Sequence, residues 1–145
     1  MSKRRGRNPH KVPKKLKKVK KVKAEKTMNH GTMTTSAFWS FIRSALRQKS
    51  RWWKPILQCK LNARRPYKGD NPRLKWEYKC AACGEYFPEK RIAVDHINPI
   101  GSLKDYSDLP NFVKTLFCEV DNLQVLHDEC HDKKTQKEKD ERNGI

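Results

Sequence analysis

Residues 80–87 read CAACGEYF, and residues 121–135 read DNLQVLHDECHDKKT. The first stretch places two cysteines three positions apart at a glycine turn, and the second places His127 and Cys130 at the same spacing. Thiolates and imidazoles are preferred ligands of zinc, which binds four of them tetrahedrally. We therefore predict a structural Cys3His zinc site made of Cys80, Cys83, His127 and Cys130.

Several other interpretations of the five cysteines remain open. In one alternative, Cys118 replaces His127 as the fourth ligand. In another, the cysteines are unrelated free or buried thiols and bind no metal. We expect Cys59 to be a buried small residue. A thioredoxin-like redox pair is disfavoured because no βαβ pattern surrounds the CxxC, and an odd number of cysteines argues against a disulfide framework. A metal would also supply folding free energy to a segment with few large apolar side chains.

The formal net charge of the 145 residues is +18, from 34 Lys and Arg against 16 Asp and Glu. The excess lies in residues 1–79, because residues 80–145 contain nine bases and 13 acids. Such an excess indicates a polyanionic partner, and nucleic acid is the first candidate. The apolar runs are too short for a membrane helix, and no secretory signal is visible, so we expect no membrane partner and a cytoplasmic location.

The composition divides the chain into three segments. Residues 1–30 are predicted to form a disordered basic tail because their charges repel and large apolar side chains are scarce. Residues 31–75 are predicted to be helical and basic, and residues 76–145 combine short strands with helices. The fold class expected is α+β, because helices, a hairpin and further helices follow one another without βαβ repeats.

In the helical segment, Thr35 or Ser36 is the expected N-cap, and Pro55 is expected to open a second helix. The tryptophans Trp39, Trp52 and Trp53 are interpreted as core residues, with base stacking as the alternative. Further on, residues 102–118 have helical character interrupted by Pro110, and residues 128–142 are expected to form a polar helix. Short strands are expected around the Cys83-Gly84 turn, with Trp76, Tyr78, Tyr86, Phe87, Ile92 and Val94.

A second group of polar residues surrounds the predicted zinc ligands. Asp95 and His96 stand side by side in VDHINPI at 94–100, Asn122 follows in the next motif, and His131 comes directly after Cys130. A carboxylate and two imidazoles beside a rigid anchor are suited to hold a catalytic metal. Each residue alone is compatible with a structural role, such as a turn cap or a satisfied core histidine.

Together, the CxxC, the Asp-His pair, the Asn-Leu and the Cys-His-x3-Lys resemble the HNH endonucleases, the ββα-metal or His-Me finger group. The resemblance covers about residues 76–139, and the helical front is similar to small phage-encoded members. A difference is His127, where many relatives have cysteine. The resemblance implies a zinc-stapled ββα-metal module that hydrolyses DNA.

The resemblance also implies roles for individual residues. His96 matches the general base, which takes a proton from the attacking water. Asp95 and His131 match the ligands of one catalytic divalent metal, such as Mg²⁺, Mn²⁺, Ni²⁺ or Zn²⁺. Asn122 matches the middle Asn, which usually tethers the loop between the two strands and so orients the base, while in some relatives an Asn at another position is a metal ligand. The candidate DNA contacts are Lys134, Arg43, Arg47, Arg51, Arg64 and Arg65.

One such site cuts one strand, so we expect a monomer to nick double-stranded DNA. Similarity to phage members implies action in the bacterial cytoplasm, with terminase or another packaging protein as a candidate partner. The main alternative is a non-catalytic zinc-containing protein that binds DNA or RNA. A basic ribosome- or RNA-associated protein would explain the tail but not the order of His96, Asn122 and His131.

Overall fold

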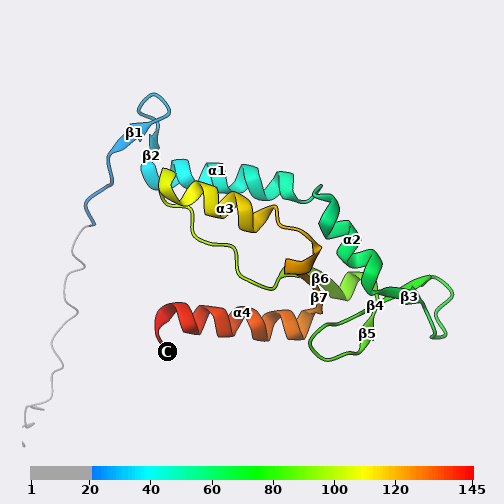
Figure 1. Ribbon diagram of the computed structural model, residues 1–145. Helices are drawn as coiled ribbons and strands as arrows, with labels where there is room; N and C mark the ends of the chain where they lie inside the picture. Colours follow the sequence, from blue (N-terminus) through cyan, green and yellow to red (C-terminus); the bar gives the residue numbers. More distant parts are fainter. Residues whose placement is uncertain (1–20) are drawn as a thin grey trace, which may run out of the picture.

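A computed structural model describes residues 21–145 of the chain (Figure 1). Most of the predicted tail, residues 1–20, lies outside the described residues. Its last part enters a short antiparallel hairpin of β1 (Lys26–Met28) and β2 (Met33–Thr34). At the turn, Asn29, His30 and Gly31 have positive φ angles of 50°, 55° and 70°, a conformation that Asn and Gly adopt most readily.

The expected helices of the basic segment are present as α1 (Thr35–Ser50) and α2 (Lys54–Ala63). Thr34 caps α1 by accepting a hydrogen bond of 3.1 Å from the Ala37 backbone N–H, so the expected cap at Thr35 or Ser36 is wrong by one or two residues. Pro55 lies in the first turn of α2, as predicted. Proline is tolerated there because the first N–H groups of a helix have no partner inside the helix.

The tolerance for proline in the first turn of a helix also explains why the interruption predicted at Pro110, within residues 102–118, is wrong. Pro110 does not interrupt a helix, because it lies in the first turn of α3 (Leu109–Leu116). A short 3-10 turn at Tyr106–Asp108 precedes it. The predicted polar helix is α4 (Asp128–Asn143), which ends at Gly144 with a φ of 71°.

Two small antiparallel sheets lie between the helices. The first sheet has the strand order β3 (Arg64–Pro66), β4 (Trp76–Lys79), β5 (Tyr86–Phe87). The second sheet consists of β6 (Ile92–His96) paired with β7 (Leu123–His127). Strands β4, β5 and β6 lie where they were predicted. Strand β7 leads directly into α4, and its register places His96 opposite Leu123 and Ile92 opposite His127. The mixed helix and strand content expected from the sequence is therefore confirmed.

Two apolar clusters join these elements. One contains Trp39, Leu103, Phe112 and Leu116 and joins α1 to α3, which lie side by side in Figure 1. The other contains Cys59, Tyr78, Leu123 and Val125 and joins α2 to β4 and β7. Both basic helices thus share a core with the segment that carries the cysteines. Cys59 is buried, as expected.

The interpretation of the tryptophans as core residues holds only in part. Trp39 is buried, and Trp53 is half-buried and donates its indole N–H to the Cys118 carbonyl at 2.7 Å. Trp52 is 82% exposed, so the core interpretation is wrong for this residue. It precedes α2, outside both apolar clusters. Within residues 21–145, no helix has the length and apolar character needed to cross a membrane.

Replacing Phe112 with Ala should destabilise the fold by about 3–5 kcal/mol, because the ring is fully buried between α1 and α3. The matched control is Phe41→Ala, since Phe41 is 61% exposed and should change stability by only about 0.5 kcal/mol. Denaturant unfolding measures both. Equal losses would contradict this description of the core.

Candidate metal centre and adjoining polar site

The four predicted zinc ligands lie together. The ligand atoms of Cys80, Cys83, His127 and Cys130 are all within 4.8 Å of one another. Cys80 follows β4, Cys83 lies in the turn before β5, His127 ends β7, and Cys130 lies in the first turn of α4. This Cys3His cluster could hold a structural metal ion such as zinc.

A tight turn brings the two cysteines of the CxxC together. The Cys80 N–H donates to the Glu85 carbonyl at 2.8 Å, and the Gly84 N–H donates to the Cys80 carbonyl at 2.9 Å. Gly84 has a φ of 76°, which a residue with a Cβ adopts only at a cost. The Ala81 N–H donates to the Val125 carbonyl at 2.8 Å, which ties this turn to β7.

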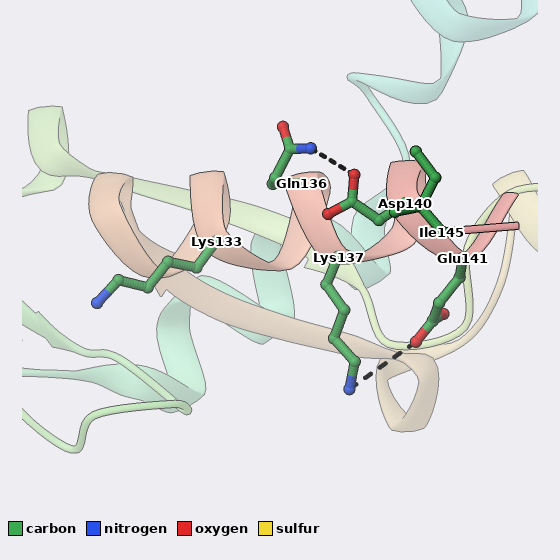
Figure 2. A pocket seen from close by; sticks show the side chains of 6 residues that line it. All are labelled: Lys133, Gln136, Lys137, Asp140, Glu141 and Ile145. Atoms are coloured by element: carbon green, nitrogen blue, oxygen red, sulfur yellow. Dashed lines mark hydrogen bonds and ion pairs between the residues drawn. The ribbon is translucent and has the colours of Figure 1, made fainter. Parts of the chain in front are cut away.

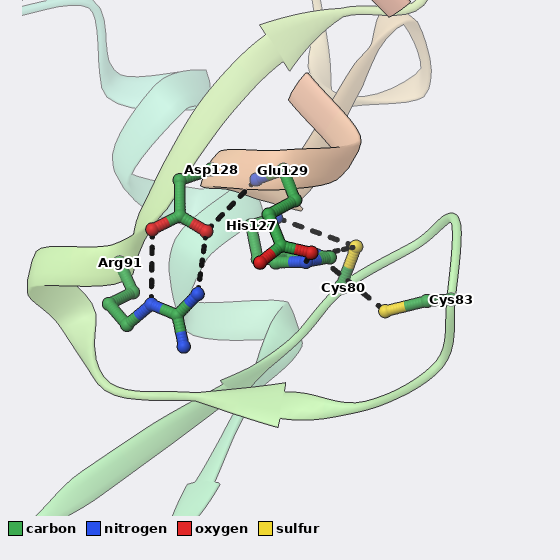
Figure 3. Close-up of polar contacts among 6 residues, drawn as sticks. All are labelled: Cys80, Cys83, Arg91, His127, Asp128 and Glu129. Carbon is green, nitrogen blue, oxygen red and sulfur yellow. Dashed lines mark hydrogen bonds and ion pairs between the residues drawn. The ribbon is translucent and has the colours of Figure 1, made fainter. Parts of the chain in front are cut away.

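The His127 imidazole is oriented by its neighbours (Figure 3). Its Nδ1 lies 3.4 Å from the Cys80 Sγ and 3.6 Å from the Cys83 Sγ, so Nδ1 is the nitrogen that faces the cluster. The ring stacks on Phe87 with centroids 4.1 Å apart and planes 5° apart. Its Nε2 lies 3.9 Å from a Glu129 carboxylate oxygen, and a carboxylate behind an imidazole commonly orients a metal ligand.

A second contact fixes the start of α4 beside this cluster (Figure 3). Arg91 donates two hydrogen bonds to the Asp128 carboxylate, of 2.8 and 3.0 Å, and its guanidinium lies 5.1 Å from the Phe87 centroid. The hydrogen bonds from Arg91 lower the pKa of the Asp128 carboxyl. Arg91 directly precedes β6 and Asp128 directly follows β7, so this pair closes one end of the two-stranded sheet.

The thiols of the cluster are not equivalent. Burial opposes ionisation of Cys80, but hydrogen bonds from the His127 side chain and from nearby backbone N–H groups outweigh it and lower its pKa to about 6. Burial, together with the neighbouring Cys80 and Cys83 sulfurs, raises the pKa of Cys130 to about 11. Three thiolates this close repel one another, and a divalent cation is the group that relieves the repulsion. The donor set therefore fits zinc.

The protein should contain one equivalent of zinc that Cys130→Ser or His127→Ala largely removes, together with a clear loss of thermal stability. The matched control is Cys118→Ser, because Cys118 packs beside Cys59 and Tyr78 and lies outside the Cys3His cluster. Elemental analysis of the purified variants measures the zinc. Zinc lost from Cys118→Ser but retained by His127→Ala would point to the alternative ligand set with Cys118.

Two residues of the second predicted group, Asp95 and His131, meet where β6 adjoins α4. The Asp95 Oδ1 lies 3.9 Å from the His131 Nε2. Two ligands bound at about 2.1 Å to one ion lie roughly 3.0–3.4 Å apart, so a small side-chain rotation would bring these atoms into range. Cys130 and His131 are neighbours on α4, yet Cys130 belongs to the cluster and His131 faces Asp95.

The other oxygen of Asp95 is already occupied. Its Oδ2 lies 2.9 Å from the Lys134 Nζ and accepts a hydrogen bond of 3.2 Å from the Gln124 amide. Lys134 also donates to the His96 carbonyl at 2.9 Å and pairs with Glu138. Partial burial lowers the pKa of Lys134, but its hydrogen bonds to Asp95 and Glu138 outweigh this and raise it. A phosphate contact by Lys134 would therefore compete with contacts inside the chain.

The His96 ring is held in one tautomer by a backbone carbonyl. Its Nε2 lies 3.1 Å from the Leu116 carbonyl oxygen, which can only accept, so Nε2 carries the hydrogen. The lone pair of the neutral ring is then on Nδ1, and no hydrogen bond within residues 21–145 occupies that atom. The half-buried imidazole is thus arranged to accept a proton at Nδ1.

Asn122 makes the contacts of a loop tether. Its side-chain Oδ1 accepts a hydrogen bond of 3.0 Å from the Asn98 N–H, and its carbonyl accepts one of 2.9 Å from the Ile97 N–H. Both donors directly follow β6. Asn122 therefore holds the chain immediately after His96.

The predicted DNA contacts have different surroundings. Arg43 donates to the Leu103 carbonyl at 3.3 Å, and Arg65 pairs with Glu77 at 2.7 Å while lying 3.3 Å from the Tyr86 centroid. Arg64 lies 4.1 Å from the Trp76 centroid. Arg47 and Arg51 are exposed near the end of α1. Arg43 and Arg65 thus make contacts inside the fold.

Sequence reasoning missed Gln124, Glu138, Phe87 and Arg91 as parts of these sites. Glu138 had a signal, because it stands four positions after Lys134 on a predicted helix. Gln124 can be placed beside Asp95 only when the register of β6 and β7 is known. Phe87 and Arg91 likewise reach His127 and Asp128 only through tertiary contacts.

The outer surface of α4 contains a shallow hollow (Figure 2). It is lined by Lys133, Gln136, Lys137, Asp140, Glu141 and Ile145. Gln136 donates to Asp140 at 2.6 Å, and Lys137 lies 3.9 Å from Glu141. Four of the six lining side chains thus pair along the helix, and the lining includes none of the predicted site residues.

Comparisons with protein-family models, curated proteins and solved structures gave no match to this chain.

Proposed function

We propose that this protein is a metal-dependent DNA endonuclease of the HNH type. The observation that carries the proposal is the approach of the Asp95 carboxylate to the His131 ring at 3.9 Å. His96, the residue after Asp95, makes no hydrogen bond through its ring Nδ1 among residues 21–145. All three side chains come from the β6–β7–α4 unit, and the Cys3His cluster lies one residue away from His131. A purely structural zinc module has no need of this second polar group.

Asp95 and His131 would hold the divalent ion. A carboxylate oxygen and an imidazole nitrogen suit Mg²⁺, Mn²⁺, Ni²⁺ or Zn²⁺, and Asp95 would bind through Oδ1 because Lys134 and Gln124 occupy Oδ2. When bound, the ion supplies charge stabilisation for the phosphate and the departing 3′ oxygen. Lys134 and Gln124 keep the carboxylate oriented toward His131.

His96 performs the proton transfer. Its Nδ1 accepts a proton from water while the water oxygen forms a bond to phosphorus and the bond from phosphorus to the 3′ oxygen breaks. The 3′ oxygen leaves with a proton from solvent, and the imidazolium returns its proton to solvent. The Leu116 carbonyl holds the ring through Nε2–H, and Asn122 fixes the chain that follows. One such site cleaves one strand, so a monomer nicks.

The alternative is a zinc-containing protein that binds nucleic acid without cleaving it. The ion pair between Lys134 and Asp95, 2.9 Å long, favours this alternative because it satisfies the carboxylate without a second metal. The two functions differ in one requirement. Only the nuclease needs an unoccupied Nδ1 on His96.

Supercoiled plasmid should be nicked by the wild-type protein in the presence of Mg²⁺, Mn²⁺ or Ni²⁺, and His96→Ala should reduce the rate by about 10²–10⁴-fold. The matched control is His30→Asn, in the exposed β1–β2 turn, where the positive φ tolerates Asn. This control should cleave at the wild-type rate. A gel assay run at several metal concentrations measures all three proteins.

DNA binding by each variant is measured in parallel, so that a fold defect is not mistaken for lost chemistry. Binding without cleavage by the zinc-loaded wild type, with every metal, would reject the nuclease in favour of the zinc-containing binding protein. Equal cleavage by His96→Ala would reject His96 as the general base.

A further inference from the structure

The hairpin of β3 and β4, with the loop of residues 67–75 between them, is called here the basic ribbon (residues 64–79). It contains six Lys and Arg against two acids, Asp70 and Glu77. Glu77 is buried and its carboxylate pairs with Arg65 at 2.7 Å. Asp70 is therefore the one acid of the ribbon that is exposed to solvent. The remaining cations on the ribbon are exposed: Arg64, Lys68, Arg73, Lys75 and Lys79.

These cations are not neutralised inside the chain. Among residues 21–145, none of the five lies within ion-pair distance of a carboxylate, in contrast to Arg65 on the same ribbon. Like charges this close in sequence repel at physiological salt, where screening acts over about 8 Å. A polyanion would relieve this repulsion, since each neutralised phosphate releases a counterion.

Hydrogen bonds also hold the loop of the ribbon in one conformation. The Tyr67 N–H donates to the Lys75 carbonyl at 3.0 Å, which closes the loop, and the Leu74 N–H donates to the Asn71 carbonyl at 3.1 Å. The Asn71 side chain accepts the Arg73 N–H at 3.1 Å. The loop backbone therefore needs little further ordering when its cations meet a ligand.

The base of the ribbon is joined to the candidate active site. Tyr78 of β4 packs with Leu123 and Val125 of β7, the strand paired with β6, which carries Asp95 and His96. Strand β4 also runs directly into Cys80, the first residue of the Cys3His cluster. A ligand held by the ribbon is thus held at a fixed position relative to His96.

We infer that the basic ribbon is the main contact with the DNA duplex, and that Lys68, Arg73 and Lys75 at its tip bind backbone phosphates. A two-stranded ribbon also has the width that a major groove accepts. The choice of DNA as the polyanion rests on the proposed function. Of the two adjacent arginines, Arg64 is available to phosphate because it lies on Trp76 without an acidic partner, whereas Arg65 is a structural residue.

The test compares two triple variants of the full chain that remove the same charge. Lys68→Ala, Arg73→Ala and Lys75→Ala are combined in one protein, and Lys133→Ala, Lys137→Ala and Lys139→Ala of α4 in the other. All six side chains are exposed. Of the six, Lys137 is the one that forms an ion pair among residues 21–145, and its partner Glu141 is also exposed. Both proteins also carry His96→Ala, so that binding is measured without cleavage. The probe is a short fluorescent DNA duplex titrated at several NaCl concentrations.

The ribbon variant should bind about tenfold or more weakly, and the slope of log affinity against log salt should fall by about 0.9 for each phosphate that the variant no longer neutralises. The α4 variant should keep the wild-type slope. Equal losses of affinity in the two proteins, or a larger loss in the α4 variant, would overturn the inference. A ribbon-dependent preference for an RNA duplex over the DNA duplex would overturn the choice of DNA.

The outcome is independent of the nuclease test. Ribbon-dependent DNA binding by a wild-type protein that never nicks plasmid would reject the proposed chemistry and support the ribbon as the DNA contact. A second ribbon variant, with the same three Ala substitutions but with His96 retained, separates the two claims: plasmid nicking by it, together with unchanged DNA affinity of the ribbon variant, would reject the ribbon and keep the nuclease.

Discussion

The convergence of four ligand atoms within 4.8 Å is the constraint on which the C-terminal half of the structure depends. The ligands come from the end of β4, a glycine turn, the end of β7 and the first turn of α4. A metal held there would join the first sheet to the second and fix where α4 begins. Because His131 directly follows Cys130, the position of the cluster also decides where His131 meets Asp95. A structural metal and a polar site are thus linked through one peptide bond.

Two groups of cations among residues 21–145 have different surroundings. Beside the candidate site and the Cys3His cluster, two cations pair with acids inside the fold: Arg91 pairs with Asp128, and Lys134 pairs with Asp95 and Glu138. On the basic ribbon, most cations have no acidic neighbour among residues 21–145. The paired charges position side chains around the candidate site, and the unpaired charges are available to phosphates.

The predictable parts of the fold are those with local signals. Helical spacing and Pro55 predicted α1 and α2, and the paired CxxC and HxxC motifs predicted which residues meet at the cluster. Strand β7 was not predicted because LQVLH is short and mixes apolar with polar residues, and it is stabilised by pairing with β6 rather than by local preference. Strand β3 was hidden in a turn-rich stretch for the same reason. Pro110 was misinterpreted because proline interrupts a helix interior but also opens a helix, and only the packing of Phe112 and Leu116 decides which.

The candidate site could be predicted as a set of residues but not as a set of contacts. Spacing along the chain selected Asp95, His96, Asn122 and His131, whereas the tautomer of His96 depends on the Leu116 carbonyl, which lies 20 residues away in sequence. The occupation of the Asp95 Oδ2 by Lys134 and Gln124 likewise depends on strand register and helix docking. Long-range contacts of this kind leave no periodic pattern in a single sequence.

The proposed function requires a second metal site at Asp95 and His131, distinct from the Cys3His cluster. Anomalous diffraction from crystals of the zinc-loaded protein soaked in Mn²⁺ tests it most directly, with data collected at the absorption edge of each metal. We expect a zinc peak among the four cluster ligands and a manganese peak between the Asp95 Oδ1 and the His131 Nε2. Zinc in the cluster, with no manganese beside Asp95 and His131 at saturating concentration, would contradict it.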